Sequence, residues 1–202
     1  MKTLINIIKI MFGKFMRLNN IIYYRHVFFY KANIKKLNFD LNLPGVIIRS
    51  LKKEETYKIL PLLKQSFHYI LDQKNFCTIA EKGEEILGYH LLTPNDMHHE
   101  CLFLDVKLFN KEVFTVSAYI NEKWRNKGLL SAMLKYQYDE WIKNRVVKRH
   151  YSISDHNNIA IITLKNKFKS ELKGHIKFIA LFKKYKFFLR NDVPDRIGFT
   201  KT

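Results

Sequence analysis

The sequence predicts an α+β fold, in which a mixed, mostly antiparallel central sheet is flanked by helices, with a helical extension at the N-terminus. Two observations lead to this prediction. Runs of strand formers with alternating apolar and polar residues recur along the chain, and two runs with apolar residues at helical spacing, 129–144 and 157–168, lie between them. The 202 residues are 47% hydrophobic with only 7 Gly and 4 Pro, which excludes collagen-like and disordered chains.

The first 45 residues form the predicted extension, and one domain is expected over 46–202. Residues 2–18 place apolar side chains on one helical face and lysines elsewhere, which is typical of an amphipathic basic helix. Its apolar face comprises Leu4, Ile5, Ile8, Met11, Phe12 and Phe15. Such a helix packs on the domain or on a second subunit, as in a homodimer, or it lies on an anionic membrane surface. Lys and Arg residues interrupt every apolar run, so we expect no membrane span.

The expected domain begins after a Pro-Gly turn pair, with a short strand at 46–49. Residues 52–70 have apolar residues at helical spacing and predict a helix, in which Pro61 introduces a break or a kink. Strand formers at 76–81 and 85–92 flank a Lys-Gly-Glu turn, which predicts a β-hairpin.

A second strand pair is expected from the alternating segments 101–109 and 112–120, which are joined by an Asn-Lys turn. The helix at 129–144 follows a polar loop. Residues 146–154 then predict a strand before the second helix, and 171–181 with 186–189 predict a terminal strand pair.

The expected strand gives way to a helix at the loop 125–130, Arg-Asn-Lys-Gly-Leu-Leu. The first turn of a helix has backbone N–H groups without intrahelical partners, and these bind anions together with the positive end of the helix dipole. Gly128 lets the chain approach a phosphate closely, and Arg125 and Lys127 add cationic side chains. These residues alone leave two interpretations open, a phosphate site and a solvated loop.

The segment 119–134 resembles the acyl-CoA-binding segment of the GNAT superfamily of N-acyltransferases, whose signature is Q/R-x-x-G-x-G/A after a strand. Arg125 and Gly128 match this signature. Leu130 departs from it, since the family prefers Gly or Ala at that position.

A second segment, Asn157 to Ala160, is similar to the family's N-x-x-A/S-x-x-x-Y passage from a strand into a helix. In the family the Asn contacts the pantetheine arm of CoA. Asn is also a common N-cap residue, so the alternative is that Asn157 only caps the helix. The family's Tyr often protonates the departing thiolate, and here Leu164 stands in its place. The resemblance covers residues 46–189.

The resemblance implies that acetyl-CoA is the acyl donor and that an amine attacks the thioester directly. It also implies that a backbone N–H near Tyr119 or Ile120 polarises the thioester carbonyl. The cofactor-binding residues that it implies are Tyr119, Ile120, Arg125, Asn126, Lys127, Gly128, Leu129, Leu130 and Asn157.

Three residues are candidates for the catalytic base, Glu112 and Asp105 on the strands before the loop and His90 on the hairpin. The alternatives are that Glu112 is a charge beside a turn and that Asp105 is solvated or pairs with Lys107 or Lys111. No metal site is expected, because the neighbouring histidines at 98 and 99 point to opposite faces of a strand.

Lys and Arg number 36 against 18 Asp and Glu, and the net charge of +18 favours an anionic partner. The favoured function is transfer of an acetyl group from acetyl-CoA to an amine acceptor that the sequence does not identify, and small amines, peptides and protein lysines remain open. An acceptor that carries phosphate would suit the charge. An amino sugar on a nucleotide or lipid carrier in bacterial surface-polysaccharide synthesis fits this description.

Two alternatives belong to other classes, a transferase of related fold that uses aminoacyl-tRNA and a non-catalytic basic adaptor on a membrane or nucleic acid. For the favoured function we do not expect a nucleic-acid partner. Cys77 and Cys101 are the only cysteines, which fits a reducing compartment. The expected location is the cytoplasm, either free or in peripheral contact with the inner face of the membrane.

Overall fold

The computed structural model describes residues 22–37, 41–63, 75–99, 104–181, 185–191 and 197–199. The helix expected at 2–18 lies outside these residues, as does Cys101. Within the described part of the chain, no helix is both long enough and apolar enough to cross a membrane.

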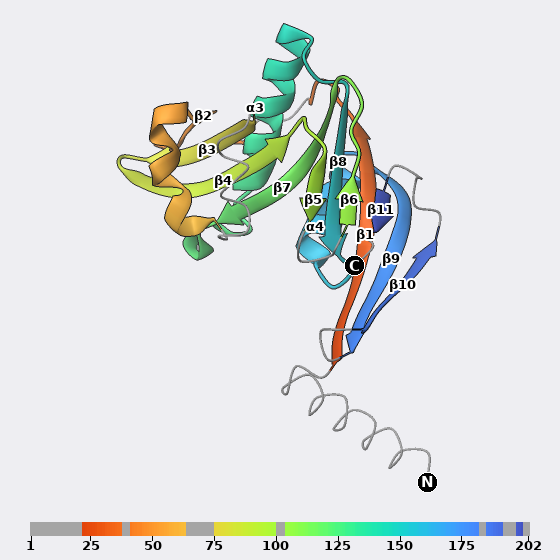
Figure 1. Ribbon diagram of the computed structural model, residues 1–202. Helices are drawn as coiled ribbons and strands as arrows, with labels where there is room; N and C mark the ends of the chain where they lie inside the picture. Colours follow the sequence, from red (N-terminus) through yellow and green to blue (C-terminus); the bar gives the residue numbers. More distant parts are fainter. Residues whose placement is uncertain are drawn as a thin grey trace.

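An eight-stranded sheet forms the body of the molecule, with the strand order β10-β9-β1-β8-β7-β4-β3-β2 (Figure 1). Its strands are β1 (Ile22–Asn33), β2 (Ile47–Ser50), β3 (Phe76–Lys82), β4 (Glu85–Thr93), β7 (Glu112–Ile120), β8 (Arg149–Asp155), β9 (Glu171–Leu181) and β10 (Tyr185–Asn191). All neighbouring pairs are antiparallel except β7 and β8, which are parallel. The mixed, mostly antiparallel sheet expected from the sequence is confirmed.

A smaller sheet has the order β11-β6-β5 and consists of β5 (Met97–His99), β6 (Leu104–Val106) and β11 (Ile197–Phe199). The helices described are α3 (Leu129–Asn144) and α4 (Ile159–Lys167), with the short 3-10 turns η1 (Lys53–Lys58), η2 (Leu60–Leu62) and η5 (Glu122–Trp124). The two α-helices and the 76–92 hairpin agree with the prediction.

Strand β1 corrects the expected boundary at residue 46. It lies inside the main sheet, where Val27 to Asn33 pair with β8 and Ile22 to Lys31 pair with β9. Phe29 is fully buried and Val27 is 2% exposed. Because both edges of β1 are paired, the domain includes residues well before 46.

Two further expectations were wrong in detail. The described part of the helix expected at 52–70 consists of two 3-10 turns, with Pro61 in the first turn of η2. The expected second hairpin does not form, because β6 pairs with β5 and β11 whereas β7 pairs with β4 and β8. One edge of β7 pairs with β4, and the start of its other edge pairs with β8.

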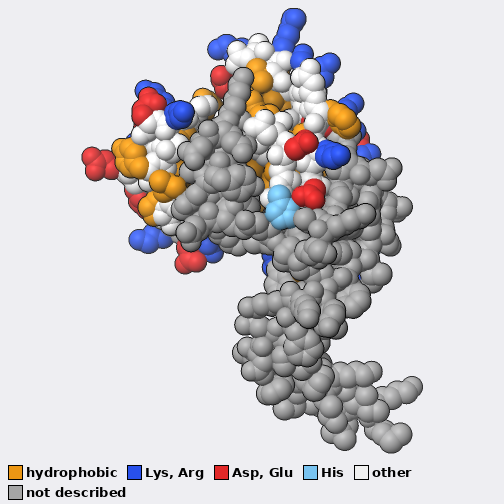
Figure 2. All heavy atoms as spheres, in the orientation of Figure 1, with side chains coloured by type: hydrophobic (Ala, Val, Ile, Leu, Met, Phe, Trp, Pro, Cys, Tyr) orange, Lys and Arg blue, Asp and Glu red, His pale blue; other side chains and the backbone are white. Residues whose placement is uncertain are grey.

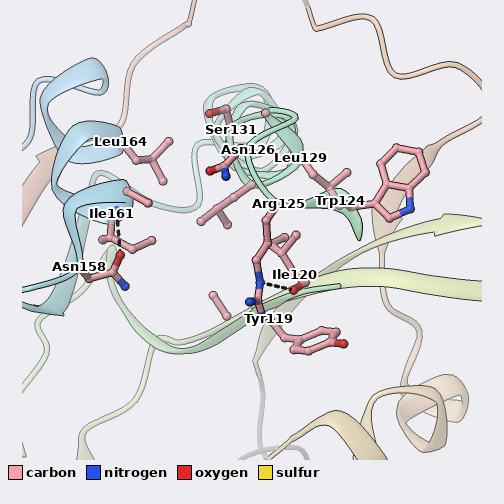
Figure 3. Close-up of a pocket in the computed structure, with 14 residues that line it drawn as sticks. Tyr119, Ile120, Trp124, Arg125, Asn126, Leu129, Ser131, Asn158, Ile161 and Leu164 are labelled. Carbon is pink, nitrogen blue, oxygen red and sulfur yellow. Dashed lines mark hydrogen bonds between the residues drawn. The ribbon is translucent and has the colours of Figure 1, made fainter. Parts of the chain in front are cut away.

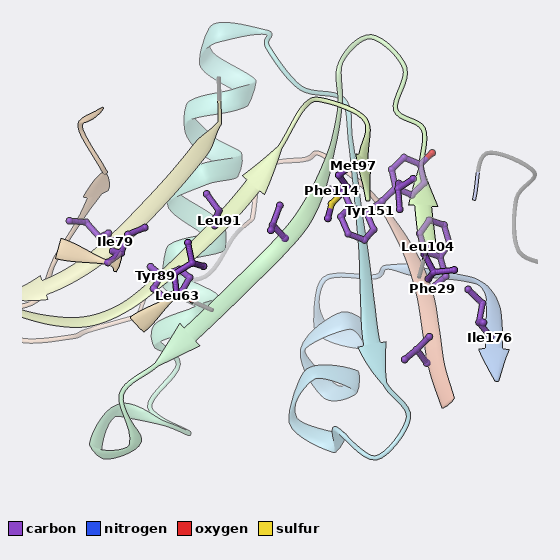
Figure 4. Close-up of a cluster of buried hydrophobic side chains, with 14 residues drawn as sticks. Phe29, Leu63, Ile79, Tyr89, Leu91, Met97, Leu104, Phe114, Tyr151 and Ile176 are labelled. Atoms are coloured by element: carbon purple, nitrogen blue, oxygen red, sulfur yellow. The ribbon is translucent and has the colours of Figure 1, made fainter. Parts of the chain in front are cut away.

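The core lies on both faces of the main sheet. Successive residues of one strand serve different clusters, since Leu91 belongs to the cluster drawn in Figure 4 and Leu92 packs with the aromatic residues of α3. The cluster in Figure 4 combines side chains from both halves of the main sheet with Met97 and Leu104 of the smaller sheet. Helix α3 covers the other face, where Leu129 and Met133 are buried.

Candidate active site

The two halves of the main sheet separate between β7 and β8. Pairing between these strands runs only from Glu112 to Phe114 on β7, after which the strands diverge, as Figure 1 shows. Just beyond this point the pairing of β7 with β4 shifts by one residue around Val116, which is a β-bulge. A bulge bends its strand and leaves the extra residue outside the ladder. The divergence and the bulge together open a gap in the middle of the sheet.

Helix α3 begins at the same end of β7. The preceding turn places Asn126 at φ 62° and Gly128 at φ 81°, and Gly128 is the N-cap residue. The Ala132 N–H donates to the Gly128 carbonyl at 3.0 Å. The N–H groups of residues 129–131 come before this hydrogen bond, in the first turn, where N–H groups have no partner within the helix. Alternation of left-handed and right-handed residues turns successive N–H groups toward one side, which makes an anion-binding concavity.

Gly128 is favoured at this position for two reasons. Its positive φ is unfavourable for a residue with a side chain. A Cβ atom there would also lie 3.0 Å from Cδ2 of Leu41.

A cavity of about 510 Å³ opens at the start of α3 (Figure 3). Seven of the nine implied cofactor-binding residues line it, namely Tyr119, Ile120, Arg125, Asn126, Gly128, Leu129 and Leu130. The side that belongs to α4 is lined by Asn158, Ala160, Ile161 and Leu164, so the two resembling segments meet across one cavity. The cavity is also lined by Trp124, Ser131, Asn158 and Ile161, which were not among the predicted site residues.

Arg125 and Lys127 occupy different surroundings. Arg125 donates from Nε to the Ile120 carbonyl at 3.3 Å, visible in Figure 3, and forms an ion pair with Glu122 at 3.1 Å. Lys127 does not line the cavity, and its Nζ lies 5.1 Å from the centre of the Trp124 ring. Trp124 does line the cavity, so Lys127 places its positive charge next to a lining residue and not in the cavity itself.

The N-cap of α4 is Asn158, whereas the sequence analysis suggested Asn157 for that role. Oδ1 of Asn158 accepts a hydrogen bond from the Ile161 N–H at 3.2 Å. Asn157 instead donates its backbone N–H to Asp155 and lies beside a separate small cavity together with His156. Two adjacent asparagines are equivalent in sequence, and only the start of the helix distinguishes them.

A second cavity, of about 450 Å³, continues from the first and shares Ala118, Leu130, Asn158, Ile161 and Leu164 with it. Its remaining lining comes from both faces of the sheet. Val116 and Val27 belong to the cluster of Figure 4, whereas Leu134 belongs to the cluster under α3. The second cavity therefore occupies the gap between β7 and β8.

A buried chain of hydrogen bonds borders this gap. His90 bonds Gln137 through Nδ1 at 2.7 Å and Thr115 through Nε2 at 3.3 Å. Thr115 in turn bonds Nε2 of His150 at 2.6 Å, and Nδ1 of His150 bonds the Tyr138 hydroxyl at 2.9 Å. Both rings therefore have partners at both nitrogen atoms.

Burial lowers the pKa of His90 to about 4 and that of His150 well below its ordinary value, so both rings are neutral near pH 7. Of the three predicted bases, His90 alone lines a cavity. Its two nitrogen atoms are occupied by Gln137 and Thr115, which is the environment of a structural histidine.

Glu112 and Asp105, the other two predicted bases, are not among the residues that line the two cavities. Glu112 is 2% exposed and binds Arg149 and Tyr151. It starts β7, about 23 Å from Tyr119 at roughly 3.3 Å per residue. Asp105 lies in the smaller sheet and pairs with Nδ1 of His98 at 2.8 Å, rather than with the lysines suggested from sequence.

Lys165 was missed as an individual candidate. It lies on α4, lines the second cavity and is only 9% exposed. Desolvation lowers the pKa of its ammonium to about 8. By contrast, burial raises the pKa of the Cys77 thiol to about 12, which makes it a poor nucleophile.

No family model matches the chain, and no curated protein matches it. Several solved structures do. A tandem GNAT protein from the clavulanic acid biosynthesis pathway superposes with a TM-score of 0.55 at 8% identity, over 78% of this chain and 53% of that one. A GCN5-related N-acetyltransferase from Kribbella flavida has a TM-score of 0.54 at 8% identity, over 82% and 62% of the two chains.

A conserved protein of unknown function from Staphylococcus epidermidis also has a TM-score of 0.54, at 10% identity, over 82% of this chain and 64% of that one. The chain thus spans between about half and two thirds of the length of these three proteins. At identities this low the likeness concerns the fold alone. The likeness therefore shows that the chain has a GNAT-like fold.

Proposed function

We propose that this chain is an acyl-CoA-dependent N-acyltransferase, which transfers an acetyl group from acetyl-CoA to an amine by direct attack. One observation carries the proposal. The uncapped N–H groups at the start of α3 open onto a cavity that continues into the gap between β7 and β8. A phosphate-bearing donor with a long flexible arm fits a site of this shape, and the GNAT fold supports the same assignment.

The donor's two ends require different surroundings. Its pyrophosphate would bind at the turn before α3, where Asn126, Gly128 and the first N–H groups of the helix lie beside the Arg125 guanidinium. Its pantetheine arm would pass the α4 wall at Asn158 and Leu164 toward the gap. Leu130 lines both cavities, so its side chain would pack against the arm in place of the smaller residue that the family prefers.

The chemistry requires an electrophilic carbonyl and a neutral amine. Backbone groups of β7 near the Val116 bulge lie outside the regular ladder and would polarise the thioester carbonyl. The amine would approach from the end of the second cavity that Arg25 and Asp155 line. Glu112 has no part in this proposal, because it lies at the far end of β7.

An amine attached to a phosphate-containing carrier, such as an amino sugar on a nucleotide or a lipid, is the acceptor that we propose. The net charge of +18 supports this proposal. On the face shown in Figure 2, Lys and Arg side chains stand among Asp and Glu side chains. A cytoplasmic location with peripheral membrane contact belongs to the same proposal.

Calorimetry with acetyl-CoA, followed by transfer assays on a panel of amines, tests the function. We expect one acetyl-CoA per chain, and acetylated product with free CoA from at least one of a nucleotide amino sugar, a peptide lysine and a small diamine. Product formed from aminoacyl-tRNA and not from acetyl-CoA would favour the related transferase. Absence of acetyl-CoA binding at millimolar concentration would refute the proposal.

A further inference from the structure

We propose that Lys165 is a catalytic residue, whose ammonium protonates the thiolate of CoA as the thioester breaks. The inference rests on the proposed acyltransfer and assigns its missing acid. Leu164, at the position where the resembling family has Tyr, has no proton to give. Lys165 is the next residue along α4.

The location of Lys165 supports this role. Lys165 and Leu164 both line the cavity in the gap between β7 and β8, and that cavity shares five residues with the one at the start of α3. The Lys165 side chain is 9% exposed, whereas Lys167 on the same helix is exposed. Lys165 is therefore a buried residue that lines the space that the donor's arm would enter.

In the part of the chain that the structure describes, no counter-ion pairs with Lys165. Among the described residues, no carboxylate lies within ion-pair distance of its Nζ, and no hydrogen-bond partner is found there. His90 of β4 and His150 of β8 are close enough to interact electrostatically with it, and both are neutral. Charged groups at the same cavity are Arg25 of β1 and Asp155 of β8, which pair with each other at 3.4 Å.

A buried ammonium without a counter-ion is costly, so negative charge that develops beside it is stabilised. Cleavage of a thioester creates such a charge on sulfur. Burial brings the pKa of Lys165 to about 8, near the roughly 8.5 of an ordinary thiol, and matched pKa values favour proton transfer. Tyr138 from α3 is a poorer donor, because its hydroxyl is bonded to His150 and burial raises its pKa.

The acceptor nitrogen forms a bond to the carbonyl carbon, the carbon–sulfur bond breaks, and its electron pair remains on sulfur. A proton moves from Nζ of Lys165 to the sulfur and gives free CoA thiol and a neutral Lys165 amine. The proton released by the acceptor nitrogen passes to water, and water returns one to Lys165.

The ionisation of bound CoA tests the assignment without any knowledge of the acceptor. CoA itself is the probe, and the ultraviolet absorbance of its thiolate is followed against pH on the full chain. In the parent we expect the bound thiol and Lys165 to titrate as a coupled pair, so that thiolate absorbance first appears at a lower pH than in free CoA. Lys165→Met should abolish this shift, while the matched control Lys167→Met should retain it.

Calorimetry on the same samples separates the two claims. If the parent binds CoA and Lys165→Met leaves the thiol pKa unchanged, the role of Lys165 is overturned and the proposed function stands. If the parent does not bind CoA, the proposed function itself fails. With an amine found active in the panel, Lys165→Met should lower kcat by about 10²-fold or more without raising the KM for acetyl-CoA, and Lys165→Arg should not restore it, because a guanidinium does not give up its proton.

Discussion

Substitution of Gly128 by Ala perturbs the start of α3, and the structure allows the loss of stability to be estimated. Gly83, in the turn between β3 and β4, is a matched control, since its φ is +59° and a Cβ there would meet nothing within 4 Å. Gly83→Ala therefore costs only the left-handed backbone, about 1–2 kcal/mol. Gly128→Ala has the same cost at φ +81° and adds a Cβ at 3.0 Å from Cδ2 of Leu41.

Thermal melts of both variants with and without acetyl-CoA test this reasoning. At about 2–4 °C per kcal/mol for a domain of this size, Gly83→Ala should lower Tm by roughly 2–8 °C and Gly128→Ala by more. Acetyl-CoA at about 100 times its Kd stabilises a native state by about 2.7 kcal/mol, so the parent and Gly83→Ala should gain roughly 5–11 °C. Gly128→Ala should lose most of that gain, because relief of the strain turns the N–H groups away from the phosphates. Equal melts and equal gains for the two variants would refute this account of the turn.

Three further predictions concern stability. Gly88→Ala places a Cβ 2.7 Å from the backbone carbonyl oxygen of Tyr119, so a melt should show a loss of about 1–3 kcal/mol, and calorimetry weaker acetyl-CoA binding. Arg49 holds the pKa of Glu55 down to about 2, so this pairing stabilises the fold above about pH 5 and the benefit is lost as pH falls toward 2. Acid titrations should show the parent converging with Glu55→Gln over that range; a constant difference would contradict the pairing. His90 takes up a proton near pH 6.5 in the unfolded chain but only near pH 4 in the folded chain. As the pH is lowered from 6.5 to 4, the free energy of unfolding should therefore decrease by up to about 3 kcal/mol in the parent, and by less in His90→Gln.

Sequence reasoning located the elements that carry local signals. The hairpin at 76–92 follows from its turn and its alternation, and α3 follows from its helical spacing. The loop at 125–130 was identified by its resemblance, and most of its residues line the cavity. The local pattern was enough to predict these three features, because each is formed by residues that are close together in the sequence.

Non-local pairing was not predictable in the same way. Strand β1 lies between β8 and β9, more than a hundred residues away, and nothing within 22–33 specifies those partners. The pairing of β6 with β11 rather than with β7 is of the same kind. Glu112 was expected near the site, because alternation along a strand shows which face a residue points to but not how far it lies from the site. In the structure it lies at the opposite end of β7. The burial of Lys165 likewise depends on how α4 sits over the gap.

A crystal structure of the chain with acetyl-CoA tests the central claim most directly. The account predicts the pyrophosphate against the N–H groups of residues 129–131 and the pantetheine arm between β7 and β8, with the thioester sulfur within reach of Nζ of Lys165. Acetyl-CoA bound elsewhere, with the start of α3 unchanged and the gap filled by protein side chains, would contradict it.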